Sequence, residues 1–412
     1  MALATAPGDV LLVADGEYRG FVLSGIRGEP LRPITILATG HAAVVKADPT
    51  CKKKHCRDTI LVRGSRHVVL DGLTSHGAPR AAVAIMYASH IVVRNGRFGN
   101  NGRWGIFTSF ADDVIFEHNE VYRSRREHGI YLSNSGDRPI VRFNALHDND
   151  GCGIHVNGDY HEKPEFDKSG RSLYAGQADG IVSGAQIEGN LIYRNGSGAL
   201  ANKKRRGGAG INLDGVWDST VQGNVLFENA AMGIAAFGDA DGVEDHSKDD
   251  GDGRFGPRGL EITHNTIVMP QGARPALQIR LSRGTNVVSG NILHHQDRRR
   301  PGLELSTRAD AMLVTSNGNV IDRVSVADQV RPLDTWVRES GQDKQSLSVP
   351  IGRLFVDPAR GDYTLKPDSP AVRRAPVVDT TVQQVVITQQ RDFFGKPPPS
   401  GKRRSIGACE AP

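Results

Sequence analysis

The chain is a succession of short apolar runs separated by turns rich in glycine and asparagine. Residues 91–95 (Ile-Val-Val-Arg-Asn) and 114–119 (Val-Ile-Phe-Glu-His-Asn) are two examples. Their apolar members are β-branched or aromatic, which favours strands, and strand side chains alternate between two faces. The pattern therefore predicts many short strands, each with an inward and an outward face.

The apolar runs recur with a nearly constant period. Gly-Ile pairs stand at positions 105, 129 and 153, in steps of 24 residues, and again at 210 and 233, which are 23 apart. The longer step between 153 and 210 requires an insertion or an extra coil. Asparagine repeats in the same phase at 95, 119, 144, 190, 224, 265 and 291, and again five residues later at 100, 149, 195 and 229. Asparagine tolerates turn backbone, so these columns predict bends that stack from coil to coil, each amide bonding to the coils above and below.

This repeat predicts a solenoid in which each coil contacts only its neighbours. The chain also resembles the pectate-lyase superfamily. Residues 7–18 and 33–36 resemble the N-terminal coils of alginate- and chondroitin-lyase-like members, and residues 392–408 resemble their C-terminal segment. The resemblance implies an all-β, single-stranded right-handed parallel β-helix (solenoid) with terminal capping segments. It is specific for the fold and gives only a weak indication of the reaction that the protein catalyses.

Three parts are expected along the chain. Capping coils occupy residues 1–58, and the regular β-helix occupies 59–325, with loop insertions at 158–182 and 239–258. A C-terminal segment, 326–412, is rich in Pro, Asp and Arg and should pack on the last coils, where it would blunt the end of the sheets.

The register of the coils separates inward from outward side chains. The Ile of each Gly-Ile pair should point inward, and the following residues alternate out, in and out. The expected outward pairs are Phe107 and Ser109, Tyr131 and Ser133, His155 and Asn157, Asn212 and Asp214, Ala235 and Phe237, and Gln278 and Arg280. Neighbouring coils lie about 4.8 Å apart, so Tyr131 and His155 should project side by side.

Tyr, His, Asn, Asp and Arg on one sheet face are groups that acid–base chemistry on a sugar needs. The expected catalytic residues are Tyr131, His155, His128 and Asp214. The expected substrate-binding residues are Asn134, Asn157, Asn212, Lys203, Lys204, Arg205, Arg206, Arg280, Gln278, Tyr160 and His161. A purely structural stack of outward polar side chains, flanked by solvated basic loops, is the alternative interpretation.

The net charge of +5 and the pI of about 9.0 fit an acidic partner, or a solvated surface with a slight excess of Arg. We expect an acidic polysaccharide substrate, no nucleic acid or membrane partner, and a monomer. The sequence has no apolar stretch of 18 residues, so we expect no membrane span. No signal peptide is visible at Met1 to Pro7.

Two further features concern compartment and metal. Cys51 and Cys56 bracket a polar segment and could close a disulfide loop, which favours an extracellular or periplasmic location. The acidic run 239–252 offers Asp239, Asp241, Glu244 and Asp245 as oxygen ligands for Ca²⁺, or it is a solvated loop. No cofactor is expected to be required.

The leading hypothesis is a polysaccharide lyase that cleaves a uronate polymer by β-elimination. Tyr131 and His155 would act as base and acid, and Arg, Lys, Asn or Ca²⁺ would neutralise the carboxylate. A glycoside hydrolase would instead pair Asp214 with Asp137 or Asp159. A C5-epimerase and a non-catalytic carbohydrate-binding β-helix are the remaining alternatives.

Overall fold

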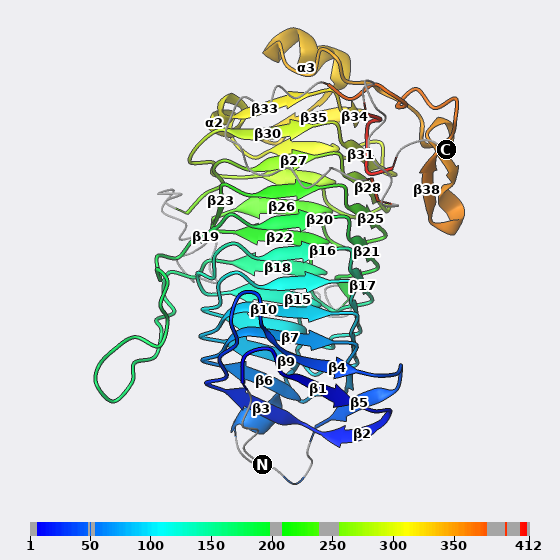
Figure 1. Cartoon of the computed structure of the whole chain (residues 1–412). Helices are drawn as coiled ribbons and strands as arrows, with labels where there is room; N and C mark the ends of the chain where they lie inside the picture. Colours follow the sequence, from blue (N-terminus) through cyan, green and yellow to red (C-terminus); the bar gives the residue numbers. More distant parts are fainter. Residues whose placement is uncertain are drawn as a thin grey trace.

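The computed structural model describes residues 6–47, 50, 54–197, 208–238, 255–376, 392–393 and 404–409. In these ranges the chain winds into a solenoid whose walls are three long parallel sheets (Figure 1). The expected right-handed parallel β-helix is confirmed. None of the helices in the described ranges has the length and apolar character needed to span a membrane.

Each coil contributes one strand to each sheet, which we name A, B and C. Sheet A contains β1 (Val10–Val13), β4 (Ile34–Ala38), β7 (Arg66–Asp71), β10 (Ser89–Arg94), β13 (Ile115–Glu117), β16 (Ile140–Arg142), β20 (Gln186–Glu188), β24 (Thr220–Gln222), β27 (Glu261–Thr263), β30 (Asn286–Ser289) and β33 (Val314–Asn317). Sheet B contains β2 (Gly16–Arg19), β5 (Ala43–Lys46), β8 (Thr74–His76), β11 (Arg97–Gly99), β14 (Glu120–Tyr122), β17 (Ala145–His147), β21 (Leu191–Tyr193), β25 (Val225–Phe227), β28 (Thr266–Met269), β31 (Ile292–His295) and β34 (Val320–Ile321).

Sheet C is the longest of the three. It contains β3 (Phe21–Ser24), β6 (Ile60–Arg63), β9 (Ala81–Met86), β12 (Trp104–Ser109), β15 (Ile130–Ser133), β18 (Ile154–Asn157), β22 (Ile211–Asp214), β26 (Ile234–Phe237), β29 (Leu277–Ile279), β32 (Leu303–Leu305), β35 (Arg323–Val326) and β36 (Gln329–Pro332). Its last strand, β36, pairs antiparallel with β35 and so ends the parallel ladder.

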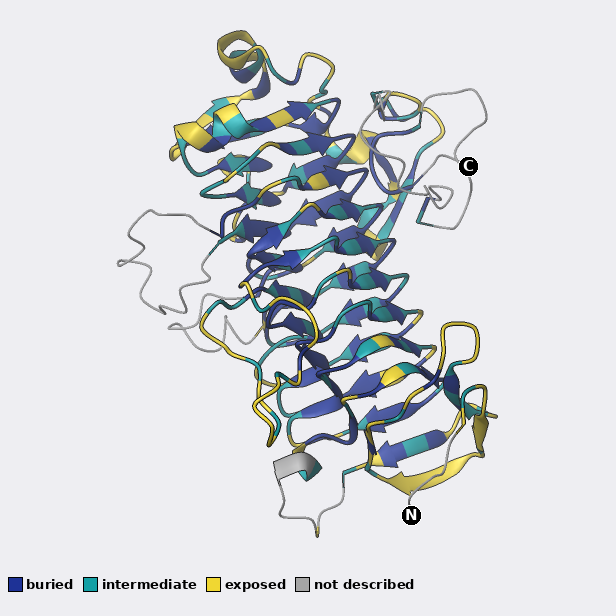
Figure 2. Cartoon of the chain, turned by 60° about the vertical axis from the view of Figure 1, so that its left-hand side comes forward, coloured by how far each residue is buried: buried dark blue, intermediate teal, exposed yellow. Residues whose placement is uncertain are grey.

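The core is one continuous column of side chains inside the solenoid. The isoleucines of the Gly-Ile pairs are fully buried, as the alternation predicted; they are Ile106, Ile130, Ile154, Ile211 and Ile234. Figure 2 shows buried residues on the strands and exposed residues mainly at the turns and the two ends. The in-and-out phase of the coils is therefore that of the sequence repeat.

Buried asparagines form a ladder at the bend between sheets A and B. Each amide nitrogen donates to the side-chain oxygen of the next asparagine, as from Asn119 to Asn144 and from Asn144 to Asn190, both at 3.0 Å. The ladder continues through Asn224, Asn265, Asn291 and Asn319. A shorter ladder at the next bend joins Asn149, Asn195 and Asn229.

Two residues of the expected columns are not in these ladders. Asn95 is exposed and bonds to Asp71, while the backbone N–H of Gly96 donates to Asn119. At the second bend Asn101, not Asn100, accepts from the coil below, at Ala78. Asn95 and Asn100 both have a left-handed φ, of 54° and 56°. They are turn residues one position before the ladder, so the expectation was wrong by one residue at both places.

Insertions leave the solenoid at the turns. The segment between β18 and β19 (Val182–Ser183) projects from the side of the solenoid (Figure 1) and is held by contacts to earlier coils. Tyr174 donates to Asp112 at 2.7 Å, the backbone of Glu165 donates to Tyr87 at 3.2 Å, and Glu165 pairs with Arg63. β19 pairs with β23 (Val216–Trp217) on the next coil.

The C-terminal part covers the end of the core and then the outside of sheet B. Helix α3 (Leu333–Ser340) places Leu333 and Trp336 against the core. Phe355, Tyr363 and neighbouring residues then pack on the outward residues of sheet B, such as Val225 and Val268. The remaining elements are η1 (Lys54–Arg57), α2 (Arg308–Leu313), η3 (Ile351–Arg353), η4 (Pro358–Arg360), β37 (Phe355–Asp357) and β38 (Asp362–Leu365).

Candidate functional site

The outward face of sheet C carries the predicted column. Tyr131 is paired in register with His155, and His155 with Asn212. One position further along the face, Asn157 is paired with Asp214. The centroids of the Tyr131 and His155 rings lie 5.0 Å apart. The expectation that these two side chains project next to each other from one sheet is confirmed.

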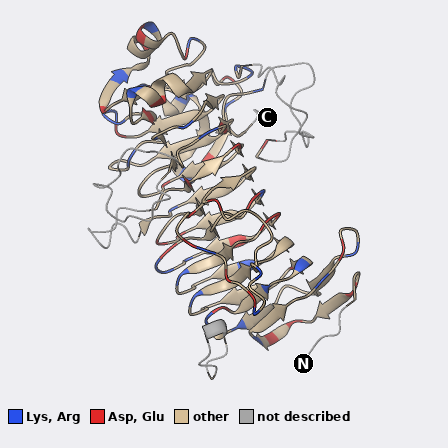
Figure 3. Ribbon diagram, turned by 90° about the vertical axis from the view of Figure 1, so that its left-hand side faces the viewer, with Lys and Arg blue, Asp and Glu red and all other residues tan. Residues whose placement is uncertain are grey.

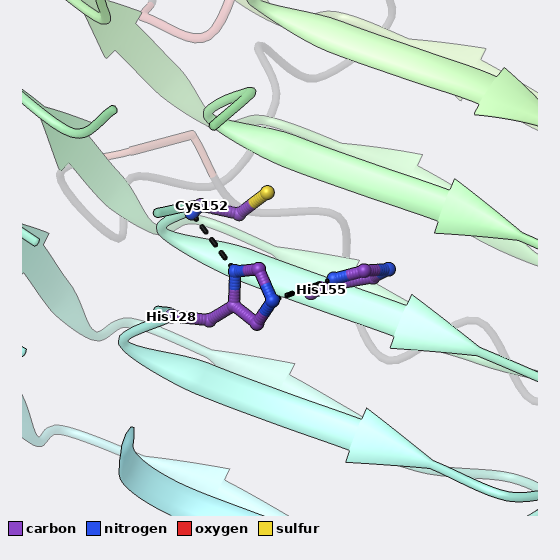
Figure 4. Close-up of side chains that lie close together, drawn as sticks. All are labelled: His128, Cys152 and His155. Carbon is purple, nitrogen blue, oxygen red and sulfur yellow. Dashed lines mark hydrogen bonds between the residues drawn. The ribbon is translucent and has the colours of Figure 1, made fainter. Parts of the chain in front are cut away.

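His128 lies in the turn immediately before β15 and contacts His155 directly. Its Nε2 lies 2.9 Å from Nδ1 of His155, and the rings meet edge to face at 82°. The other nitrogen of His128, Nδ1, accepts a hydrogen bond of 3.0 Å from the backbone N–H of Cys152 (Figure 4). Gly151 allows this approach, because a Cβ there would lie 2.8 Å from His128 Nδ1.

These contacts fix where the protons of the two imidazoles lie. A neutral imidazole has one N–H and one acceptor nitrogen. Because His128 Nδ1 accepts from a backbone N–H, the proton of a neutral His128 is on Nε2. That N–H donates to His155 Nδ1, so the proton of His155 is on Nε2. Within the described part of the chain, no group hydrogen-bonds to this buried nitrogen.

Burial keeps both histidines neutral. It lowers the pKa of His155 to about 4. It also holds the pKa of His128 well below its usual value, with additional effects of His155 and Arg103. Protonating His155 would also place its Nδ1–H against the Nε2–H of His128, and protonating His128 would place its Nδ1–H against the backbone N–H of Cys152. At neutral pH the pair is therefore uncharged.

Tyr131 is held by Asn157. Nδ2 of Asn157 donates to the Tyr131 hydroxyl at 3.2 Å, and Oδ1 of the same amide accepts from the backbone N–H of Asp159 at 3.0 Å. Burial raises the pKa of Tyr131, and the hydrogen bonds from Ser133 and Asn157 act in the opposite direction. The hydroxyl oxygen thus accepts a hydrogen bond in a dry setting, and its own proton is available for donation.

An aromatic cluster adjoins Tyr131 on the N-terminal side. Trp104 and Phe107 stack with centroids 4.3 Å apart, and both rings contact the ring of Tyr131. Arg80 lies over Phe107 and is held by Asp58, whose side chain is fully buried. The cluster gives the Tyr131 ring a rigid, apolar neighbour.

Trp104 belongs to a column that the sequence analysis missed. Trp104, His128 and Cys152 each precede a Gly-Ile pair, in consecutive coils. The signal was present in the sequence, since the residue before each pair repeats with the same period. Of this column, only His128 was among the expected site residues.

A bound metal does not fit the His128, Cys152 and His155 group as it stands. Their ligand atoms lie within 4.8 Å of one another, a combination that Zn²⁺ would accept. A histidine ligand binds through an unprotonated nitrogen and donates its other N–H to an acceptor. His128 faces the N–H of Cys152 instead, and burial raises the pKa of the Cys152 thiol to about 12. The thiol packs against Ala209, Met232 and Ala235.

Other expected binding residues lie apart from this pair. Asn134 is buried, and its amide is bonded to Ser109 and Ser133. Gln278 is on the same face of sheet C, two strands beyond Asn212, and donates to Glu304. Arg280 follows β29 directly.

Tyr160 and His161 belong to the insertion after β18. The Tyr160 ring contacts Phe255 and carries Lys163 over its face, and His161 is exposed. The expected basic residues Lys203, Lys204, Arg205 and Arg206, and the expected Ca²⁺ ligands Asp239, Asp241, Glu244 and Asp245, lie outside the described residues.

Charged residues lie mainly at the turns and the ends of the solenoid (Figure 3). Near the pair, Arg103 and Trp104 both contact Glu127, and Asp159 lies in the turn after Asn157. Cys56 is disulfide-bonded, as the sequence predicted for that cysteine, whereas Cys152 and Cys409 are buried and not disulfide-bonded. Cys51 lies outside the described residues.

Comparisons with known proteins agree with this fold. The family model described as a right handed beta helix region matches residues 49–169. No curated protein matches the chain. A crystal structure of pectate lyase Pel9A is similar with a TM-score of 0.57 at 14% identity, over 99% of this chain and 89% of that one. An alginate lyase from Paenibacillus sp. str. FPU-7 gives 0.50 at 17% identity, over 71% and 90%. By its fold, the chain is a right-handed parallel β-helix, similar to these two lyase structures.

Proposed function

We propose that this protein is a polysaccharide lyase that cleaves a uronate-containing polymer by β-elimination. The observation that carries the proposal is the pairing of Tyr131 and His155 on the outward-facing side of sheet C, with ring centroids 5.0 Å apart and Asn157 bonded to the tyrosine hydroxyl. The buried N–H of His155 has no protein partner in the described ranges. A donor in this position is suited to a substrate oxygen, because leaving it unpaired costs about 1–3 kcal/mol.

The two side chains divide the chemistry. Tyr131 first loses its hydroxyl proton to solvent, aided by the hydrogen bond from Asn157 against the burial that raises its pKa, and the phenolate then takes the proton from C5 of the uronate. The electron pair forms the C4–C5 double bond while the bond from C4 to the glycosidic oxygen breaks, and the phenol then returns the proton to that oxygen. His155 donates to an oxygen of the C6 carboxylate, which spreads the charge that develops next to it. Asn157 supports the phenolate through its hydrogen bond.

An acidic polymer suits the rest of the molecule. The net charge is +5, and coils about 4.8 Å apart present one outward position per coil along the axis. Two proteins that share the fold are a pectate lyase and an alginate lyase. The disulfide-bonded Cys56 favours an extracellular or periplasmic location. We propose a monomer without an obligatory cofactor.

The deciding experiment is a panel of uronate polysaccharides incubated with the full chain, with and without a chelator. A lyase releases products with a new ultraviolet absorbance from the C4–C5 double bond. Reducing ends without that absorbance would instead indicate a hydrolase that uses Asp214, with Asp137 or Asp159. A changed uronate composition without cleavage would indicate an epimerase. Binding without any turnover would leave a carbohydrate-binding protein.

A further inference from the structure

The contact between His128 and His155 determines more than the position of a ring. Three donors follow one another in a single direction, from Cys152 N–H to His128 Nδ1, from His128 Nε2 to His155 Nδ1, and on to the N–H of His155 at Nε2. The first donor is a backbone amide, which cannot give up its proton or turn round. The direction of this series of hydrogen bonds is therefore set by the backbone N–H of Cys152, in the coil that carries β18.

We propose that His128 is a positioning residue that locks His155 in the Nε2–H form, so that His155 meets its substrate as a hydrogen-bond donor and never as a base. This inference rests on the proposed function only where it speaks of a substrate. The lock itself is a property of the resting protein. With His155 fixed as a donor, Tyr131 is left as the group that removes the substrate proton. The N–H of His155 would then donate a hydrogen bond to an oxygen of the substrate's acidic group.

The surroundings favour the uncharged form of the pair. His155 is flanked by Tyr131, His128 and Asn212. The charged groups that act on His128 or Tyr131 are Arg103 and Glu127, which pair with each other at 2.6 Å, and Asp159. None of the described carboxylates contacts either imidazole of the pair. A protonated imidazole would thus gain no ionic partner from these residues.

The lock can be read without any substrate by long-range ¹H–¹⁵N spectra of protein labelled at histidine nitrogen. Between pH 6 and 9 we expect His155 to have a protonated Nε2 and a bare Nδ1, with no change across the range. Assignment uses the loss of the signal in His155→Ala. A resting His155 with its proton on Nδ1, or an imidazolium at pH 7, would overturn the proposal.

Two variants of His128 separate positioning from packing. In His128→Phe the ring volume remains but the donor is lost, and we expect the His155 nitrogen shifts to move toward a tautomer mixture. In His128→Gln the amide N–H can still donate, so we expect the single Nε2–H pattern to return. Unchanged His155 shifts in a folded His128→Phe protein would overturn the proposal, and so would a mixture in a folded His128→Gln protein. If neither variant folds, the wild-type spectrum alone decides.

Zn²⁺ provides an independent test. We expect no change in the histidine spectra on adding Zn²⁺, and tight binding that removes the proton of His128 or His155 would overturn the lock. If a lyase substrate is found, turnover in His128→Phe should fall about tenfold or more and recover in His128→Gln. A confirmed tautomer without turnover on any polymer would reject the proposed function alone.

Discussion

Two outer faces of the solenoid carry histidine and tyrosine in adjacent coils, and they use them differently. On sheet B, Tyr122, His147, Tyr193 and Phe227 stack with interplanar angles of 6°, 10° and 1°. Both nitrogens of His147 face carboxylates, Asp148 at 2.7 Å and Glu120 at 3.3 Å. On sheet C the rings are tilted, and one nitrogen of His155 is buried without a partner in the described chain.

The difference separates a structural stack from the pair that we propose to be reactive. Parallel rings with every polar atom paired stabilise a surface and leave nothing for a ligand. An unpaired buried donor destabilises the resting protein, and such features persist where function requires them. The same residue types at the same spacing therefore indicate a structural role on sheet B and a functional role on sheet C, and their hydrogen bonds distinguish the two.

The largest expected effect comes from a substitution in the core directly below the Tyr131–His155 pair of sheet C. Ile154 precedes His155 and is fully buried, so Ile154→Asp places an unpaired charge in the core. We expect loss of about 4 kcal/mol or more of stability, or failure to fold, in thermal and urea denaturation. Asn212→Asp, on the outward face of the next coil, is the control and should unfold near the wild-type midpoint. Similar midpoints for both variants would contradict the assigned phase.

The second effect concerns turnover. Tyr131→Phe and His155→Ala should lower kcat/KM on the uronate polymer by about 100-fold or more, because each removes a group that touches the reacting atoms. The matched sheet B variants, Tyr193→Phe and His147→Ala, should keep turnover within about threefold of wild type. Equal losses on the two faces would place the chemistry elsewhere.

The third effect distinguishes the faces by pH. His155 has a native pKa of about 4, below the unfolded value near 6.5, so the unfolded state takes up protons first as the pH falls. Stability should therefore decrease from pH 6.5 to 4, by about 1.4 kcal/mol per pH unit for each proton. His155→Phe should flatten this slope in urea titrations. A slope equal to that of the wild type would show that His155 does not contribute.

The corresponding effect on sheet B lies at lower pH. Hydrogen bonds from Arg194 and His147 lower the pKa of Asp148 to about 2. Its contribution is present above the unfolded value near 3.9 and is lost as the pH falls toward 2. Asp148→Asn should therefore change the titration below pH 4 and leave the range from 4 to 6.5 unaltered.

The smallest effect is a difference in stability between variants of the two faces. His147→Ala removes two partnered nitrogens and a stacked ring, and we expect a loss of about 1–2 kcal/mol. His155→Phe keeps the ring volume and removes the unpaired Nε2–H, but it also leaves the Nε2–H of His128 without its acceptor, so its stability at pH 7 should stay within about 1 kcal/mol of the wild type. A larger loss in His155→Phe than in His147→Ala would mean that His155 is a structural residue.

The sequence predicted the fold and the pairing of Tyr131 with His155 because strand alternation and a constant coil length determine both. It did not distinguish Asn95 from the ladder position next to it, since adjacent turn positions both accept asparagine and spacing alone does not show which amide faces inward. The contact of His128 with His155 could not be predicted from the sequence either. That contact depends on side-chain rotation and on a backbone N–H, neither of which follows from residue type.

The asparagine ladder has a consequence for how such a protein changes over time. Because the buried amides fix each coil against the next, the segment between β18 and β19 can be long without rotating the strands that follow it. Mutations that lengthen a turn and mutations on the sheet face thus act on separate properties. Under the proposed function, changes in the loops would alter which polymer is bound while the proposed reacting groups stay aligned.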